Sequence, residues 1–367
     1  MSESPIKIKM SLKKLFFCLF ILALLFVWKG CTGEPAKDPD VTIHAAPPLK
    51  ISSPANDDQF TIGEIVEVKL EIKDPLKVKN LELFVDDTLY QTGLKSESQT
   101  IKIDTKNGRV GYVKLFVSYT DDKGENHGDT RIIVFFSDII PAQKKAVKVK
   151  LFPHDKASYT QGLEFYKGKL YEGTGHAGKS VLAEVNLESG SHTRFHKLDE
   201  DIFGEGITIL NDTIYQLSWQ NKICFVYDMN FSLIKQFTYE GEGWGLCNDG
   251  KSLIMTDGTS EIVWRNPRTF EIEKRLDVFS NEDSIESLNE LELVDGNLFI
   301  NVYGENYIVE VDTSKGKVLS KIDCSDIVKE GRIPGADVLN GIARDQKTGK
   351  IYITGKWWPK MFEVIFE

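Results

Sequence analysis

Cysteine is scarce in this sequence, and its spacing excludes two kinds of structure. Five cysteines occur among 367 residues, and only three of them, Cys224, Cys247 and Cys324, lie beyond the N-terminal region. They are too few and too unevenly spaced for a zinc ligand set or a disulfide framework. We expect them to be buried as small apolar side chains, and their odd number leaves at least one free thiol.

Runs of positive charge are also lacking outside the extreme N-terminus. The formal net charge is −10, and no run of lysine or arginine alternates with aromatic residues. Such a basic surface is what proteins use to hold nucleic acid, so we exclude a nucleic-acid partner. With 41% hydrophobic and 27% charged residues, the composition is typical of folded, water-soluble domains. At about 150 residues per domain, the length predicts about two folded units.

A long apolar run is missing as well. Residues 15–27 are apolar and follow a basic start, but they fall short of the ~20 residues that cross a bilayer as a helix. The pattern is typical of a secretory signal, which we assign to residues 1–31. Its last two residues, Gly30 and Cys31, resemble a bacterial lipoprotein lipobox, although Trp28 and Lys29 depart from the usual box.

From this segment we expect lipidation of Cys31 and a protein anchored in the cell envelope, periplasmic or at the surface. An ordinary cleaved signal and a retained signal anchor are the alternatives. Residues 32–49 are rich in proline and small residues, as expected of a linker that holds a domain away from a membrane.

Residues 50–139 consist of short segments in which apolar and polar residues alternate. These segments are 64–74, 80–90, 98–106, 111–121 and 129–138. Alternation with a period of two is typical of half-buried β-strands. About seven short strands in this length predict an immunoglobulin-like β-sandwich. The domain carries no convincing chemistry, and we interpret it as a spacer or adhesion module.

Residues 140–367 contain an internal repeat. Its units begin at Gln161, Glu205, Trp244, Asn289 and Asn340, so they recur every 39 to 51 residues. Each unit has two apolar strands joined by a tight turn and then continues into another hairpin. Four strands per repeat at this period predict an all-β, five-bladed β-propeller. The last repeat lacks a strand, and we expect residues 144–155 to supply it and close the ring.

The starts of the innermost strands should meet at one end of the propeller channel. Gln161, Glu205, Trp244 and Asn289 occupy these places in four repeats. Unlike polar and aromatic residues gathered around one axis predict a ligand pocket. The alternative is that Glu205 is a channel-lining group, solvated or paired within the propeller. Gly204 and Gly206 could let backbone and substrate approach closely, or could simply be turn residues.

Several motifs resemble the plant-type glutaminyl-peptide cyclotransferases. They are FPHD and YTQGL (152–163), YEGTG (171–175), FGEGIT (203–208), YQLSW (215–219), GWGL (243–246), DGTS (257–260), LNELE (288–292), DVLNGIA (337–343) and TGKWWPKMFEV (354–364). The resemblance covers about 146–367. It implies a five-bladed propeller and an enzyme that converts N-terminal glutamine of peptides or proteins to pyroglutamate with release of ammonia.

The same resemblance implies roles for polar residues. Glu205 aligns with the catalytic carboxylate, a general acid and base. Lys356 aligns with a pocket lysine that would stabilise the oxyanion, or it is a solvated turn residue. Asn289 and Gln161 align with groups that would hold the substrate amide or α-amine, and the alternative for both is hydrogen bonding between blades.

Aromatic residues would form the walls of that pocket. Tyr159, Phe203, Trp219 and Trp244 align with wall positions, and core packing is the alternative. Tyr303 stands where the family pattern has tryptophan, so the size or substrate preference of the pocket is expected to differ.

The resemblance also implies that catalysis needs no cofactor and no metal. Animal-type glutaminyl cyclases are zinc enzymes on an unrelated scaffold, and this sequence supplies no such ligand set. A structural calcium ion in the channel stays open, with Glu290, Asp257 or backbone carbonyls as ligands. His154 and Asp155 precede the first repeat, and we expect them to help close the ring. A closed propeller needs no partner for stability, so we expect a monomer.

Two other functions stay open at this point. One is a non-catalytic surface propeller that binds peptides or glycans. The other is a propeller hydrolase or lactonase that depends on a central calcium ion.

Overall fold

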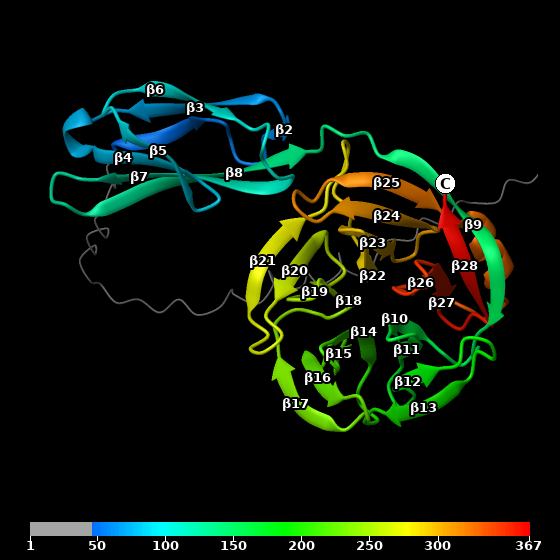
Figure 1. The fold of residues 1–367 in the computed structure, drawn as a ribbon. Helices are drawn as coiled ribbons and strands as arrows, with labels where there is room; N and C mark the ends of the chain where they lie inside the picture. Colours follow the sequence, from blue (N-terminus) through cyan, green and yellow to red (C-terminus); the bar gives the residue numbers. More distant parts are fainter. Residues whose placement is uncertain (1–45) are drawn as a thin grey trace, which may run out of the picture. The chain divides into compact units, whose positions relative to one another are not determined.

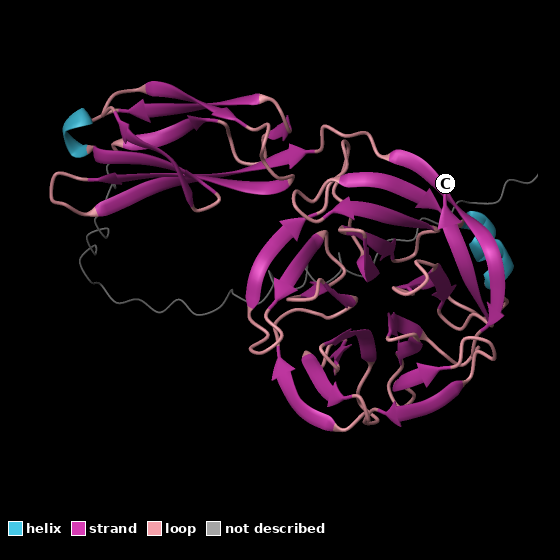
Figure 2. Cartoon of the chain, in the orientation of Figure 1, coloured by secondary structure: helices cyan, strands magenta, loops and turns pink. Residues whose placement is uncertain are grey.

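Strands dominate the computed structural model, which describes residues 46–367 (Figure 2). The predicted signal segment 1–31 with its Cys31, and residues 32–45 of the predicted linker 32–49, lie outside the described residues. Within 46–367 the only α-helix is α1 (Ser325–Gly331). No helix of this part of the chain is long and apolar enough to span a membrane. Residues 46–367 therefore form an all-β structure, as predicted.

Residues 49–136 form a sandwich of two sheets, drawn from blue to green in Figure 1. The strands are β1 (Leu49–Ser53), β2 (Gln59–Thr61), β3 (Ile65–Ile72), β4 (Lys79–Val85), β5 (Thr88–Leu94), β6 (Gln99–Asp104), β7 (Gly111–Thr120) and β8 (Asn126–Phe136). One sheet has the order β1-β3-β6 and the other β2-β8-β7-β4-β5. In β3 the buried residues Val66, Val68 and Leu70 alternate with polar ones, so the observed burial follows the pattern in the sequence.

The rest of the chain forms sheets that follow one another around a circle (Figure 1). Three separate four-stranded sheets are β10–β13, β14–β17 and β18–β21. Their strands are β10 (Thr160–Tyr166), β11 (Lys169–Thr174), β12 (Val181–Val185), β13 (His192–Lys197), β14 (Gly204–Leu210), β15 (Thr213–Ser218), β16 (Ile223–Asp228), β17 (Leu233–Thr238), β18 (Leu246–Asn248), β19 (Leu253–Thr256), β20 (Glu261–Arg265) and β21 (Ile272–Asp277).

The remaining strands join through β9 into one sheet, with the order β22-β23-β24-β25-β9-β28-β27-β26. These strands are β9 (Ala142–Pro153), β22 (Leu288–Val294), β23 (Asn297–Val302), β24 (Tyr307–Asp312), β25 (Val318–Asp323), β26 (Leu339–Arg344), β27 (Ile351–Gly355) and β28 (Lys360–Phe366).

Strand β9 completes the last group of strands. Its residues 146–153 pair antiparallel with β28, which is the pairing that the sequence predicts for this segment. Its first residues, 142–145, also pair in parallel with β25, which the repeat pattern did not indicate. The outer edge of β28 is thus covered, and an exposed sheet edge is avoided.

The first strands of the repeats, β10, β14, β18, β22 and β26, contact one another in cyclic order. All seven residues of β14 are buried. The glycines that follow two repeat starts permit this contact: a Cβ on Gly162 would lie 2.4 Å from the amide nitrogen of Ile207, and one on Gly206 would lie 2.5 Å from that of Leu246. Gly162 and Gly206 thus bring backbone against backbone of neighbouring sheets.

The three cysteines of the described residues behave as expected from their spacing. Cys224, Cys247 and Cys324 are free and buried, and each belongs to a cluster of apolar core side chains.

Candidate active site

A cavity of about 260 Å³ lies at the starts of the inner strands. Its lining consists of Tyr159, Gln161, Phe203, Glu205, Trp219, Trp244, Asn289, Tyr303 and Lys356. These are the nine pocket residues that the sequence analysis names. They come from every group of strands in the ring, because the start of each inner strand and the turn after its neighbour face the same end of the channel.

Glu205 is the buried carboxyl of this cavity. It is the second residue of β14, the second inner strand, and only 4% of the residue is exposed. The side-chain amide of Gln161 donates a hydrogen bond to Oε1 over 3.0 Å. Burial raises the pKa of Glu205 well above its usual range, since desolvation disfavours the charged form, while nearby Lys356 opposes that shift. The carboxyl therefore holds a proton at pH values where a solvated glutamate has lost it.

Lys356 follows β27 and is 3% exposed. Burial lowers its pKa to about 8, although the charges of Glu205 and Asp337 favour the ammonium form. The Nζ atom lies 4.8 Å from the ring centre of Tyr159 and 5.0 Å from that of Tyr303. Contacts with aromatic faces stabilise a cation in such a site. Lys356 is therefore a cavity residue and not a solvated turn residue.

Two amide side chains complete the polar lining. The Oδ1 atom of Asn289 is buried and has no hydrogen-bond partner within residues 46–367. A buried acceptor without a partner costs free energy, so a ligand N–H at this point would be stabilising. Asn340 fixes the side chain of Gln161. Its amide donates to Gln161 Oε1 over 3.3 Å and to the backbone carbonyl of Thr160 over 3.0 Å. Gln161 therefore presents its N–H to Glu205.

Aromatic side chains enclose the remaining surface. Phe203 packs edge-on against Trp219, with ring centres 5.6 Å apart, and Trp244 packs edge-on against Tyr303 at the same distance. Tyr159 packs on Phe203 at 6.1 Å. Of the nine lining residues, only Tyr303 is largely exposed, with 42% of its surface accessible. The family difference at this position thus lies at the open side of the cavity.

Three residues that fix this lining were not identified as site residues from the sequence. Asn340 starts the fifth repeat, so the position of the other anchors was a signal for it. Asp337 accepts a 2.9 Å hydrogen bond from the hydroxyl of Tyr159. Glu242 accepts hydrogen bonds from both cavity tryptophans. It directly precedes the GWGL motif, the only hint in the sequence.

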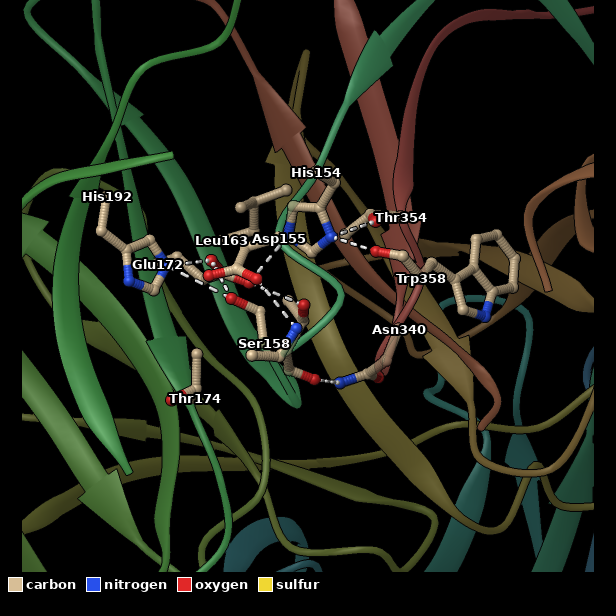
Figure 3. A network of polar contacts seen from close by, with 12 residues as sticks. His154, Asp155, Ser158, Leu163, Glu172, Thr174, His192, Asn340, Thr354 and Trp358 are labelled. Carbon is tan, nitrogen blue, oxygen red and sulfur yellow. Dashed lines mark hydrogen bonds and ion pairs between the residues drawn. The ribbon is translucent and has the colours of Figure 1, made fainter. Parts of the chain in front are cut away.

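A buried polar network lies next to the site, around Glu172 (Figure 3). One carboxylate oxygen accepts hydrogen bonds from His154 Nε2 over 3.0 Å and Thr160 Oγ1 over 2.7 Å. The other accepts one from Ser158 Oγ over 3.0 Å and contacts His192 Nε2 at 3.3 Å. Ser158 and Thr160 flank the cavity residue Tyr159, so Glu172 holds that segment in place.

His154 links this network to the end of the chain. Its Nδ1 lies 2.8 Å from the carbonyl oxygen of Trp358. A carbonyl and a carboxylate both accept hydrogen bonds, so both ring nitrogens of His154 must donate, which makes the ring an imidazolium. Accordingly, Glu172 raises the pKa of His154 against the opposing effect of burial, and both histidines hold the pKa of Glu172 far below its usual range. His154 thus forms a buried ion pair with Glu172, which agrees with the structural role expected for it.

Replacing Glu172 by glutamine should lower the free energy of unfolding by about 3 to 5 kcal/mol, because a buried imidazolium loses its counter-charge. Glu172 contributes its full share to the stability of the fold above its usual pKa of 4.5, and this share is lost as pH falls through its lowered pKa. That of His154 is present below 6.5 and is lost as pH rises through its raised pKa. In denaturant unfolding, the free energies of the unaltered chain and of Glu172→Gln should therefore differ most between pH 4.5 and 6.5.

The surface carboxylate Glu188, whose side chain is 75% exposed, provides the control. Glu188→Gln should leave the unfolding free energy nearly unchanged at every pH. Equal stabilities of the Glu172→Gln and Glu188→Gln variants would contradict the buried ion pair.

The residues named for a channel calcium ion have other partners. Glu290 accepts backbone hydrogen bonds from Leu163 over 3.2 Å and Ile342 over 2.7 Å, and Asp257 accepts from Thr259. Within 46–367, the one group of three side chains close enough to hold a metal is Asp121, Glu125 and His127, which lines no part of the cavity. The calcium ion stays a prediction.

Two family models match parts of this chain. The family model of glutamine cyclotransferase matches residues 137–366, and that of the bacterial Ig domain matches 47–117. A glutaminyl-peptide cyclotransferase of Arabidopsis thaliana is 37% identical over 221 residues, which cover 58% of this chain and 68% of that protein.

A solved structure is similar as well. The glutaminyl cyclase of Myxococcus xanthus superimposes with a TM-score of 0.59 at 32% sequence identity, covering 62% of this chain and 98% of that one. The match of the family model spans more than half of the chain. The chain belongs to the glutamine cyclotransferase family of enzymes.

Proposed function

We propose that this protein is a glutaminyl-peptide cyclotransferase, which converts N-terminal glutamine to pyroglutamate and releases ammonia. The observation that carries the proposal is one buried carboxyl, Glu205, that shares a cavity with Lys356 and Asn289 between aromatic walls. The names of the Arabidopsis and Myxococcus proteins support the same reaction.

The reaction needs one proton to move between two nitrogens. The neutral α-amine of the substrate attacks the carbon of its own side-chain carboxamide, so a C–N bond forms and an oxyanion develops. The C–N bond to the former amide nitrogen then breaks, and ammonia leaves. Glu205 accepts the proton from the attacking nitrogen and gives it to the departing one. Burial raises the pKa of this carboxyl, which makes it a stronger base than a solvated carboxylate and suits it to accept and return a proton.

The other polar groups act on charge and orientation. The Lys356 ammonium would stabilise the oxyanion in a site from which water is largely excluded. The free Oδ1 of Asn289 would accept a hydrogen bond from the substrate amide or α-amine. Gln161 holds the Glu205 carboxyl by its 3.0 Å hydrogen bond.

The walls supply the positioning that an intramolecular reaction needs. Trp219 and Trp244 would pack against the substrate methylenes and keep the α-amine near the carboxamide. Well-oriented pairs reach effective molarities on the order of 10⁵ M or more. The walls would also exclude water, which would otherwise compete with the amine as a nucleophile.

We further infer that residues 140–367 are a five-bladed propeller, residues 50–139 a sandwich domain and residues 32–49 a linker. The cyclic contacts of five inner strands support the number of blades. The match to the bacterial Ig domain supports an immunoglobulin-like sandwich.

We also propose that the protein is exported, lipid-anchored at Cys31 and monomeric. Export and the anchor rest on the sequence of residues 1–31. The monomeric state rests on the closed ring. Fractionation of cells that carry the full chain tests the anchor, which a wholly soluble protein would contradict.

An assay of ammonia release with peptide mass analysis tests the proposed activity. The purified chain should act on a peptide that begins with glutamine, because that peptide has both the free α-amine and the carboxamide. The same peptide with an acetylated α-amine should not react. No ammonia from the free peptide, with measurable binding, would instead favour a peptide-binding propeller without turnover.

A further inference from the structure

Glu242 lies outside the cavity lining but contacts two of its walls. It is in the segment between β17 and β18 and is half-buried. Its Oε2 accepts hydrogen bonds from Trp219 Nε1 over 2.6 Å and Trp244 Nε1 over 3.0 Å. Its Oε1 accepts one from the Gln220 amide over 3.2 Å. One carboxylate thus binds tryptophans that belong to two neighbouring sheets.

These contacts decide what the two indoles present to a ligand. An indole has one hydrogen-bond donor, its Nε1–H. Both donors are committed to Glu242, so neither can compete with Glu205, Asn289 or Lys356 for the polar atoms of a ligand. The cavity surface of Trp219 and Trp244 is therefore carbon, which suits the methylenes of a side chain.

A carboxylate also fixes the directions of the two rings. Hydrogen bonds to a charged acceptor are shorter and stronger than hydrogen bonds between neutral groups, such as those that water would offer the indoles in exchange. The backbone supports the same arrangement on both sides: the amide of Trp219 donates to the carbonyl of Phe203, and the carbonyl of Trp244 accepts from Gly206, next to Glu205.

We propose that Glu242 is a positioning residue for the cyclisation reaction, which holds the indoles of Trp219 and Trp244 so that their apolar surfaces clamp the methylenes of an N-terminal glutamine. This inference rests on the proposed function for its substrate. Glu242 acts through the two tryptophans and transfers no proton. The negative charge of Glu242 also contributes to the raised pKa of Glu205, although less than burial does.

Kinetics of Glu242→Ala test the proposal, with Glu240→Ala as a matched control. Glu240 lies two residues away in the same segment, its side chain is fully exposed, and it pairs with Lys222 at 3.5 Å. Glu242→Ala should lower kcat/KM about tenfold to a hundredfold, with KM raised, because the walls no longer hold the substrate in a reactive geometry. Glu242→Gln keeps one acceptor and should recover part of the loss. Glu240→Ala should match the unaltered chain.

A double-mutant cycle separates positioning from general damage. In a chain that carries Trp219→Phe and Trp244→Phe, both indole donors are already absent. If Glu242 acts through them, Glu242→Ala should cost little further activity in that background. A loss as large as in the unaltered background, or Glu242→Ala kinetics like those of Glu240→Ala, would overturn the proposal.

Tryptophan fluorescence distinguishes failure of this inference from failure of the proposed function. Glu242→Ala should make tryptophan emission more open to quenching by acrylamide, and Glu240→Ala should not, whether or not the chain turns over a peptide. If the chain is inactive but Glu242→Ala shows this fluorescence change, the proposed activity is refuted and the positioning of the two indoles by Glu242 stands. If the chain is active and Glu242→Ala shows neither the fluorescence change nor a kinetic loss, only the positioning role of Glu242 is refuted.

Discussion

Glu205→Gln is expected to lower kcat for cyclisation by a factor of about 10² to 10⁴, which is the usual contribution of a general acid or base. Glutamine keeps the shape of the side chain and can still pair with Gln161, so KM should change little. It cannot accept the proton of the attacking amine or return one to the leaving nitrogen. Initial rates of ammonia release at saturating peptide give kcat directly.

Glu164→Gln provides the control for this experiment. Glu164 lies on β10, is 6% exposed and lines no part of the cavity. Burial raises its pKa to about 8, so it is largely protonated at neutral pH and glutamine resembles it closely. Its backbone partner is the amide of Ile209 at 2.9 Å. If Glu205→Gln has a kcat as high as that of Glu164→Gln, Glu205 does not act as the general acid and base.

Lys356→Met is the variant with the second largest expected effect. Methionine fills similar space without the charge, so kcat should fall by about 10² to 10³, as for the loss of one oxyanion-stabilising donor. In the unaltered chain, kcat should also fall as pH rises through the pKa of Lys356, about 8, because the ammonium is lost. That alkaline decline should be absent from the variant. The pH dependence of kcat in both proteins measures it.

Lys360→Met separates this effect from the loss of any nearby lysine. Lys360 is on β28, and its ammonium donates to the carbonyl of Glu330 over 3.1 Å, away from the cavity lining. The Lys360→Met variant should keep both the kcat of the unaltered chain and its decline at alkaline pH. An unchanged pH profile of kcat in Lys356→Met would contradict the role of Lys356 in the charged transition state.

The lining of the cavity could be predicted from sequence because it depends on register. Each inner strand starts at the same point of its repeat, so Gln161, Glu205, Trp244 and Asn289 had to meet once the ring closed. Trp219, Tyr303 and Lys356 follow second strands, and their assignment needed the family resemblance. No structure was required for either step.

The supporting residues could not be predicted in the same way. Glu242 and Asp337 lie in irregular segments, where the direction of a side chain does not follow from spacing. The partners of Glu172 come from 12 to 20 residues away along the chain. Asn340 was within reach, since it occupies the fifth anchor. The double pairing of β9 was missed because the repeat pattern indicates only the strand that a blade lacks, and not a second neighbour.

A crystal structure of the Glu205→Gln variant with a bound glutaminyl peptide would show directly whether the reaction takes place in this cavity. We expect the side-chain methylenes of the peptide to lie between Trp219 and Trp244. Its α-amine and carboxamide should both lie within hydrogen-bond distance of residue 205, with the carboxamide oxygen towards Lys356. A peptide bound outside this cavity, or with its carboxamide turned away from residue 205, would contradict this expectation.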